Sequence, residues 1–385
     1  MSHKLRKVDH DGDGSLTARV AAFQRITVKH RKLEEALESL LAYLFNEAEE
    51  GIICIIGPTG VGKTTLRKLC ITAVLAHEAS AIEEDHGYIP IVEVEARAPE
   101  RGNFDWATFY RDSLVALQEP LVDRKILTKE DSAKVRAEGN SGPGFRSLLQ
   151  YRIALDNALK FRHVKYFLID EAQTLLKVSS ARLASDQMDT VKSRASLTGV
   201  QHALIGTYEL LNTGDLSAQL SRRRRNIHLP RYDCGNAADL EEFISVIHTF
   251  QSRLPLPCSR DLIESVDFLY AKTLGCVGIL KTWLNGVVST AAQRGATKIT
   301  IKDLERKALP NRDLMTMLAE IQEGEERFIG PSDVTLMAEL GLKKSPSDNE
   351  NSADAVQATT AVKTPRRRPG QRRPVRDPIG RSAIA

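Results

Sequence analysis

Ile52-Ile-Cys-Ile-Ile56 is a short, continuous apolar run, and Gly57-Pro-Thr-Gly-Val-Gly62-Lys63-Thr64 follows it directly. An apolar run without polar alternation is typical of a central parallel strand, because helices cover both of its faces. The next residues, Leu66–His77, place apolar side chains at helical spacing. A glycine-rich loop between a strand and a helix, ending in Lys-Thr, predicts a loop whose backbone N–H groups surround phosphate.

This loop predicts a site for ATP and Mg²⁺. The start of the following helix adds partial positive charge. Lys63 is expected to reach the β- and γ-phosphates, while the Thr64 hydroxyl is expected to ligate Mg²⁺. The loop residues predicted to bind the nucleotide are Gly57, Pro58, Thr59, Gly60, Val61, Gly62, Lys63, Thr64 and Thr65.

A second apolar run, Tyr166-Phe-Leu-Ile-Asp170-Glu171, ends in two carboxylates, which is the Walker B pattern. Asp170 is expected to complete the nucleotide site by holding Mg²⁺ through water. Glu171 is placed to polarise the attacking water, and a carboxylate there indicates an ATPase rather than a protein that only binds ATP. A solvated acidic strand end is the alternative, and the phosphate loop upstream argues against it.

Two further polar positions are expected to act at the γ-phosphate. Ile205-Gly206-Thr207 closes another apolar strand, and the Thr207 hydroxyl is predicted to lie beside the γ-phosphate, although Gly-Thr is also common in turns. Arg222-Arg-Arg-Arg225 precedes the last strand. We interpret it as an arginine finger for the γ-phosphate of a neighbouring subunit, worth roughly 10³–10⁵ in rate. A solvated basic turn or a nucleic-acid contact is the alternative, and spacing alone does not select the arginine.

The order of apolar runs and helical stretches predicts a three-layer α/β fold. Five strand-like runs are separated by helical stretches, and a parallel sheet of five strands results. The runs are Ile52–Ile56, Ile89–Val94, Lys165–Ile169, Gln201–Ile205 and Asn226–Leu229. After residue 236 the pieces Ala237–Phe250, Ser259–Leu274 and Gly278–Arg294 read as helices, which predicts a small all-α domain.

The chain is expected to divide into six segments. They are a flexible N-terminus (1–24), the sheet domain (25–235), the helical domain (236–310), a helix and loop (311–343), a disordered linker (344–362) and a basic Pro/Arg tail (363–385). The tail carries Lys363 and seven arginines but only one acidic residue, Asp377, so its own net charge is +7. The net charge of the whole chain is +4. The rest of the chain is therefore slightly acidic. No apolar run is long enough to span a membrane and no secretory signal is visible, so we expect a cytoplasmic protein without a membrane partner.

Together these residues resemble AAA+ ATPases, and more narrowly the TnsC/TniB family of transposition regulators. The resemblance covers roughly residues 25–310. Its narrower features are the strand end Ile205-Gly-Thr-Tyr-Glu209 and Gln219-Leu-Ser-Arg-Arg223, and the family pattern selects Arg223 as the finger. The resemblance implies an AAA+ P-loop αβα domain followed by a helical lid.

The resemblance also implies partners. It implies that ATP-bound subunits form a ring or filament on double-stranded DNA, that a target-selection protein chooses the site, and that the assembly recruits the transposase before hydrolysis dismantles it. The DNA contacts it points to are Arg97 and Arg101. AAA+ proteins often carry a lid arginine in Gly-x-x-Arg; here Gly275-Cys-Val-Gly278 has glycine at that place, and Lys281 is a candidate substitute.

Two other classes of function stay open. One is a scaffold that uses ATP only to assemble and does not hydrolyse it, against which Glu171 argues. The other is a different AAA+ machine, such as an initiator, a clamp-loader-like ATPase or a secretion-associated ATPase. No winged-helix domain is recognisable after residue 310, which weakens the initiator interpretation.

We predict that the tail docks a partner and takes no part in hydrolysis. Its linker of about twenty residues spans roughly 25 Å, so the tail can find a ligand without fixing its orientation. Deleting 363–385 should leave ATP hydrolysis nearly intact and lower transposase recruitment, measured by co-sedimentation. Scrambling 369–381 should do the same. Full recruitment by the scrambled tail would leave only electrostatic attraction to DNA.

Overall fold

A computed structural model describes residues 15–46, 51–99, 102–124, 143–178, 181–216 and 224–342. The chain divides into two compact units, Met1–Gly330 and Pro331–Ala385. The predicted linker and tail lie outside the described residues, as do Arg101, Arg222 and Arg223.

A five-stranded parallel sheet forms the centre of the first unit, in the order β2-β3-β4-β1-β5. The five predicted strands are all present. Their bounds are β1 (Ile52–Ile56), β2 (Ile91–Glu95), β3 (Tyr166–Asp170), β4 (Gln201–Gly206) and β5 (Arg224–His228).

Strand β1 is buried on both faces, which explains its unbroken apolar sequence. Ile52, Cys54 and Ile56 belong to one hydrophobic core, and the alternate residues Ile53 and Ile55 belong to another. Because successive side chains of a strand point to opposite faces, the sheet separates two cores. The fold is therefore the three-layer αβα arrangement of an AAA+ P-loop domain.

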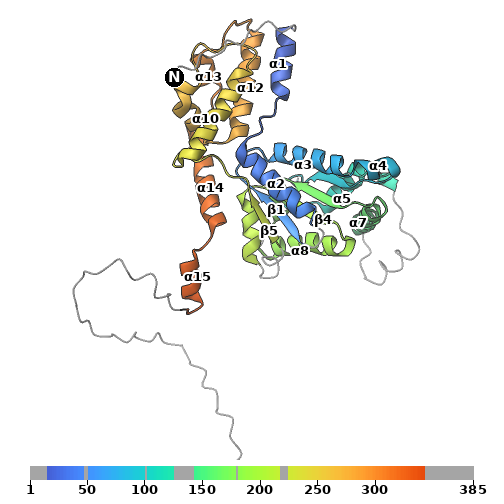
Figure 1. Ribbon diagram of the computed structural model, residues 1–385. Coiled ribbons are helices and arrows are strands. Elements are labelled where there is room, and N and C mark those ends of the chain that lie inside the picture. The colour runs from blue at the N-terminus through green and yellow to red at the C-terminus, as the bar shows by residue number, and fades with distance from the viewer. Residues whose placement is uncertain are drawn as a thin grey trace, which may run out of the picture. The chain divides into compact units, whose positions relative to one another are not determined.

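Helices cover both faces of this sheet (Figure 1). On one face lie α2 (Arg31–Leu44) and α3 (Lys63–His77), which contribute Leu40 and Leu66 to the core. The other face is covered by α5 (Trp106–Ala116), α7 (Pro143–Phe161) and α8 (Ala181–Thr198). Short helical pieces complete the connections: α4 (Ala79–Glu84), η1 (Val122–Arg124), η2 (Ala172–Leu176) and η3 (Tyr208–Leu216).

The helices after the sheet pack around a core of their own. They are α10 (Ala237–Ser252), η4 (Ile263–Ser265), α11 (Val266–Thr273), α12 (Val277–Gln293) and α13 (Ile301–Lys307). The prediction of one helix over Ser259–Leu274 is wrong in its first part. Cys258 forms a parallel bridge with Ile299, and Ser259 N–H donates to Ile299 O, so the chain is extended there and the helix begins at Val266.

The expected flexible N-terminus also differs from the structure. Helix α1 (Leu16–Arg25) begins at a Ser15 cap and lies beside α12 (Figure 1). Phe23 is buried in the core of the helical domain, with its ring 6.5 Å from that of Phe250. This segment is ordered because it covers apolar surface of helices more than two hundred residues further along the chain.

Helix α14 (Asn311–Ile329) returns to the sheet domain. The Phe328 ring stacks on His228 at 4.2 Å between centroids, and the Tyr208 hydroxyl lies 2.8 Å from His228 Nε2. A side chain at Gly324 would meet the Tyr208 ring at 2.2 Å, so glycine is needed for this close approach. The helix therefore contacts the segments that follow β4 and β5.

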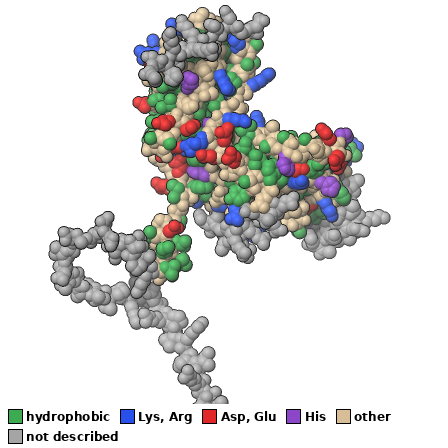
Figure 2. Space-filling view, in the orientation of Figure 1, with side chains coloured by type: hydrophobic (Ala, Val, Ile, Leu, Met, Phe, Trp, Pro, Cys, Tyr) green, Lys and Arg blue, Asp and Glu red, His purple; other side chains and the backbone are tan. Residues whose placement is uncertain are grey.

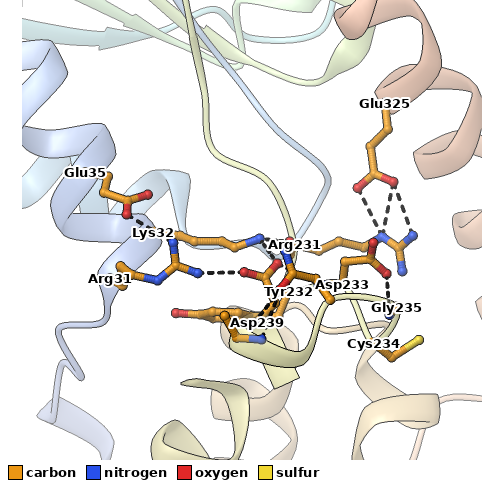
Figure 3. A network of polar contacts seen from close by, with 12 residues as sticks. Arg31, Lys32, Glu35, Arg231, Tyr232, Asp233, Cys234, Gly235, Asp239 and Glu325 are labelled. Atoms are coloured by element: carbon orange, nitrogen blue, oxygen red, sulfur yellow. Dashed lines mark hydrogen bonds and ion pairs between the residues drawn. The ribbon is translucent and has the colours of Figure 1, made fainter. Parts of the chain in front are cut away.

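A polar network joins the sheet domain to the helical domain (Figure 3). Asp239 of α10 accepts hydrogen bonds from Lys32 and, at 2.6 Å, from Arg31, both of α2. Arg231, in the connection between the domains, pairs with Glu325 of α14 at 3.1 Å. Burial raises the pKa of Asp239, but hydrogen bonds from Lys32 and the Asp233 N–H outweigh it, and the pKa lies below its usual range.

The second unit contains helix α15 (Asp333–Glu339), whose apolar side chains are exposed (Figure 2). Val334, Leu336, Met337, Leu340 and Leu342 are each about half or more exposed. Across the described part of the chain, no helix is long and apolar enough to cross a membrane.

We predict that Asp239→Ala destabilises the protein by about 3–5 kcal/mol at neutral pH, because it leaves the Lys32 ammonium buried without its partner. Since the pKa of Asp239 is lowered by folding, this stabilisation is present above the ordinary carboxyl pKa and is lost as pH falls through the folded value. Chemical denaturation over a pH series measures both effects. Glu35→Ala, which removes an exposed partner of Arg31, is the control and should cost under about 1 kcal/mol. Equal losses in the two variants would contradict the importance of the network.

Candidate nucleotide site

The loop of residues 57–62 joins β1 to α3, and its glycines are required by close contacts or by their backbone conformation. A Cβ at Gly57 would lie 2.3 Å from Leu229 O. Gly60 and Gly62 have φ of +77° and +124°, a backbone region that favours glycine. These glycines give the loop its tight course and leave its amide groups unobstructed.

Lys63 lies inside the loop. Its side chain is buried, and Nζ donates to Gly57 O and Pro58 O at 2.9 Å each. Burial lowers the pKa of Lys63, and the nearby charges of Glu171 and Asp170 oppose the shift. Thr64 is exposed in the first turn of α3, and no side chain caps this helix at Gly62. The free amide groups of that turn favour an anion.

The two carboxylates of the Walker B pattern follow β3 in different environments. Asp170 is buried, and its Oδ1 accepts from the Glu171 N–H at 2.9 Å. Its Oδ2 accepts from Arg67 Nη1 at 2.6 Å, and Arg67 also pairs with Glu93 at 3.0 Å. Glu171 is exposed and has a left-handed backbone, with φ of +51°. Asp170 is thus held rigidly, while the Glu171 carboxylate faces solvent.

Thr207 follows β4, and its hydroxyl is buried without a hydrogen-bond partner among the described residues. The Gln173 side chain lies between Thr207 and Glu171. Its Nε2 donates to Glu171 Oε2 at 2.6 Å, and its Oε1 accepts from the Thr207 N–H at 3.3 Å. The carboxyl ends of β1, β3 and β4 therefore bring the phosphate loop, both carboxylates and Thr207 to one edge of the sheet.

Two residues of this cluster were missed in the sequence. Arg67 lies four positions after Lys63, which places it one turn further along the same helix face, and this spacing could have indicated it. Gln173 follows the Walker B pattern by two residues, and nothing in the sequence shows that its amide reaches β4.

The helical domain contacts the phosphate loop directly. Ile279 N–H, in the first turn of α12, donates to Gly60 O at 3.0 Å. A Cβ at Gly278 would lie 2.4 Å from the same oxygen, so a residue larger than glycine does not fit there. This is the position that arginine occupies in the Gly-x-x-Arg element of many AAA+ proteins. Lys281, the candidate substitute, contacts α1 in this structure. Its ammonium donates to Phe23 O and lies 4.0 Å from the Phe23 ring centroid, where burial lowers its pKa to about 8.

The remaining predicted residues lie apart from this cluster or outside the described residues. Arg97 is exposed and pairs with Asp112 at 3.2 Å. Arg101 and Arg223 belong to undescribed segments. Figure 2 shows acidic and basic side chains interspersed over the face in view.

Comparison with known families identifies the sheet domain. A family model described as an AAA domain matches residues 46–213, the stretch that contains the loop, both carboxylates and Thr207. These residues form an AAA domain. The match covers less than half of the chain, and curated proteins provide no match to this sequence.

Solved structures similar to the chain include the ORC2 protein of Aeropyrum pernix, at 16% identity, with 74% of this chain and 69% of that chain covered and a TM-score of 0.46. Drosophila ORC bound to DNA is similar at 12% identity, with 90% and 84% covered and a TM-score of 0.42. The RuvB Holliday junction branch migration motor of Thermotoga maritima is similar at 15% identity, with 83% and 86% covered and a TM-score of 0.36.

The cluster in the AAA domain fits a nucleoside triphosphate with Mg²⁺. Gly57 and Gly60 of the loop have no room for a Cβ, the loop precedes an uncapped helix, and a buried ammonium lies within it. Across from the loop, a buried hydroxyl without a partner and two carboxylates supply the oxygen donors that Mg²⁺ and its water ligands prefer.

We predict that Gly278→Ala separates α12 from the phosphate loop. The added Cβ would overlap Gly60 O, so the variant should lose about 1–3 kcal/mol of stability and bind ATP more weakly. Gly286→Ala is the matched control on the same helix. Nothing lies within 4 Å of a Cβ there, so it should stabilise the protein by about 0.5–1 kcal/mol. Denaturation and fluorescent-nucleotide titration measure the two effects, and identical behaviour of both variants would contradict the contact.

Proposed function

We propose that this protein is an ATP-hydrolysing, Mg²⁺-dependent regulator of DNA transposition. In this proposal it oligomerises on double-stranded DNA, connects target-site selection to transposase recruitment, and disassembles when ATP is hydrolysed. The observation that supports ATP turnover is the cluster of Lys63, Glu171 and Thr207 at one edge of the sheet, with Asp170 beside them.

The binding roles follow from the charge and position of each group. The amides of the loop and the Lys63 ammonium neutralise the triphosphate, and in the ATP-bound protein Lys63 exchanges its two carbonyl partners for phosphate oxygens. Thr64 and Asp170 would hold Mg²⁺, which would supply neutralisation of the phosphate charge. Arg67 orients the Asp170 carboxylate through its charged hydrogen bond.

The catalytic roles fall to groups on the opposite side of the site. Glu171 accepts a proton from the attacking water and is exposed enough to reach it. Thr207 presents its hydroxyl beside the γ-phosphate. Arg223 of a neighbouring subunit supplies a further positive charge at the γ-phosphate, so that only the oligomer hydrolyses ATP at full rate.

The transposition part of the proposal rests on sequence resemblance to TnsC/TniB proteins. The strand end Ile205-Gly-Thr-Tyr-Glu209, the Gln-Leu-x-x-Arg pattern ending at Arg223, and the Pro/Arg tail support it. Arg97 and Arg101 are the proposed DNA contacts. Phosphate contacts of this kind are independent of sequence and weaken as salt increases.

We predict that Glu171→Gln separates binding from turnover. The amide keeps the shape of the side chain and removes the base, so phosphate release should fall by about 10²-fold or more while ATP binding is kept. Lys63→Ala should instead lose ATP binding, and Glu264→Gln, an exposed change in the helical domain, should alter neither. Phosphate release with and without double-stranded DNA is the measurement. Wild-type protein that binds ATP but releases no phosphate under any condition would favour the non-hydrolysing scaffold.

A further inference from the structure

The turn after β3 is tied to the strands on either side of it. On the β2 side, the Thr174 hydroxyl donates to Ala96 O, and Ala96 N–H donates to Asp170 O at 2.8 Å. On the β4 side, the Gln173 amide accepts from the Thr207 N–H. The left-handed backbone of Glu171 starts this turn, directly before the short helix η2.

Gln173 is buried to more than nine-tenths and is packed against β4. A Cβ at Gly206 would lie 2.4 Å from Gln173 Oε1, so the glycine makes room for the amide. Thr207 N–H is one of its two partners and Glu171 Oε2 is the other, at 2.6 Å. A planar amide held by both of its ends has one orientation, with the N–H pointing at the carboxylate.

We infer that Gln173 is a positioning residue, which aims the Glu171 carboxylate and couples it to the Thr207 strand end. This inference rests on the proposed ATP hydrolysis. Glu171 is exposed and would otherwise sample several rotamers. The bond from Gln173 fixes Oε2 and leaves Oε1 to take the proton from water. Because the other end of the amide is held by the Thr207 N–H, a shift of the β4 end on nucleotide binding moves the carboxylate as well.

The test compares two substitutions that remove different bonds. Gln173→Met keeps the length of the side chain and removes both hydrogen bonds. Gln173→Glu keeps an acceptor for the Thr207 N–H but removes the donor to Glu171. Both variants should retain ATP affinity within about twofold and lose about ten- to a hundredfold in kcat, which is the effect of one hydrogen bond to a charged group. Gln201→Met is the matched control, since Gln201 bonds Tyr43 O away from the site.

A double-mutant cycle separates positioning from a structural role. If Gln173 acts through Glu171, adding Gln173→Met to Glu171→Gln should leave the residual single-turnover rate within about twofold of Glu171→Gln alone. A structural role predicts instead that the two losses multiply, and that Gln173→Glu, which keeps the bond to β4, retains wild-type kcat. Either result would overturn the inference.

The proposed function can fail separately. If wild-type protein and Gln201→Met bind ATP but neither releases phosphate with DNA present, hydrolysis itself is absent and Gln173 has no base to position. If both hydrolyse ATP and Gln173→Met does so at the same rate, hydrolysis stands and the inference about Gln173 is wrong.

Discussion

Burial of β1 on both faces is the constraint on which the rest of the structure depends. With a core on each side, the strand lies inside the sheet, between β4 and β5, and its carboxyl end opens into the glycine loop. The carboxyl ends of parallel strands lie at the same edge of the sheet. The loop, the carboxylates that follow β3 and Thr207 are therefore close together.

The contacts around this edge connect it to the rest of the first unit. The helical domain touches the loop through the backbone of α12, and α14 touches the segments just after β4 and β5. The polar network of Asp239, Lys32 and Arg31 holds α10 against α2, so the helical domain is attached at a second place.

Much of the fold was predictable because strong local patterns determine it. Strand-like runs separated by helical stretches predicted all five strands, and the loop and the Asp-Glu strand end predicted where ligand-binding residues gather. The packing of α1 was not predictable, because the surface it covers is formed by helices far along the chain. The roles of Arg67 and Gln173 were not predictable, because each side chain bonds to a residue of another element, Arg67 to Asp170 and Gln173 to Thr207. The contact of Lys281 with Phe23 also depends on the packing of α1 and could not be predicted from the sequence.

The most direct test of the account measures assembly on double-stranded DNA while ATP is consumed. Sedimentation of the protein with a DNA duplex can be followed together with phosphate release. We expect large complexes with ATP, their persistence when Glu171 is replaced by Gln, and their dispersal as wild-type protein converts ATP to ADP. Complexes of the same size with ATP, with ADP and without nucleotide would contradict it.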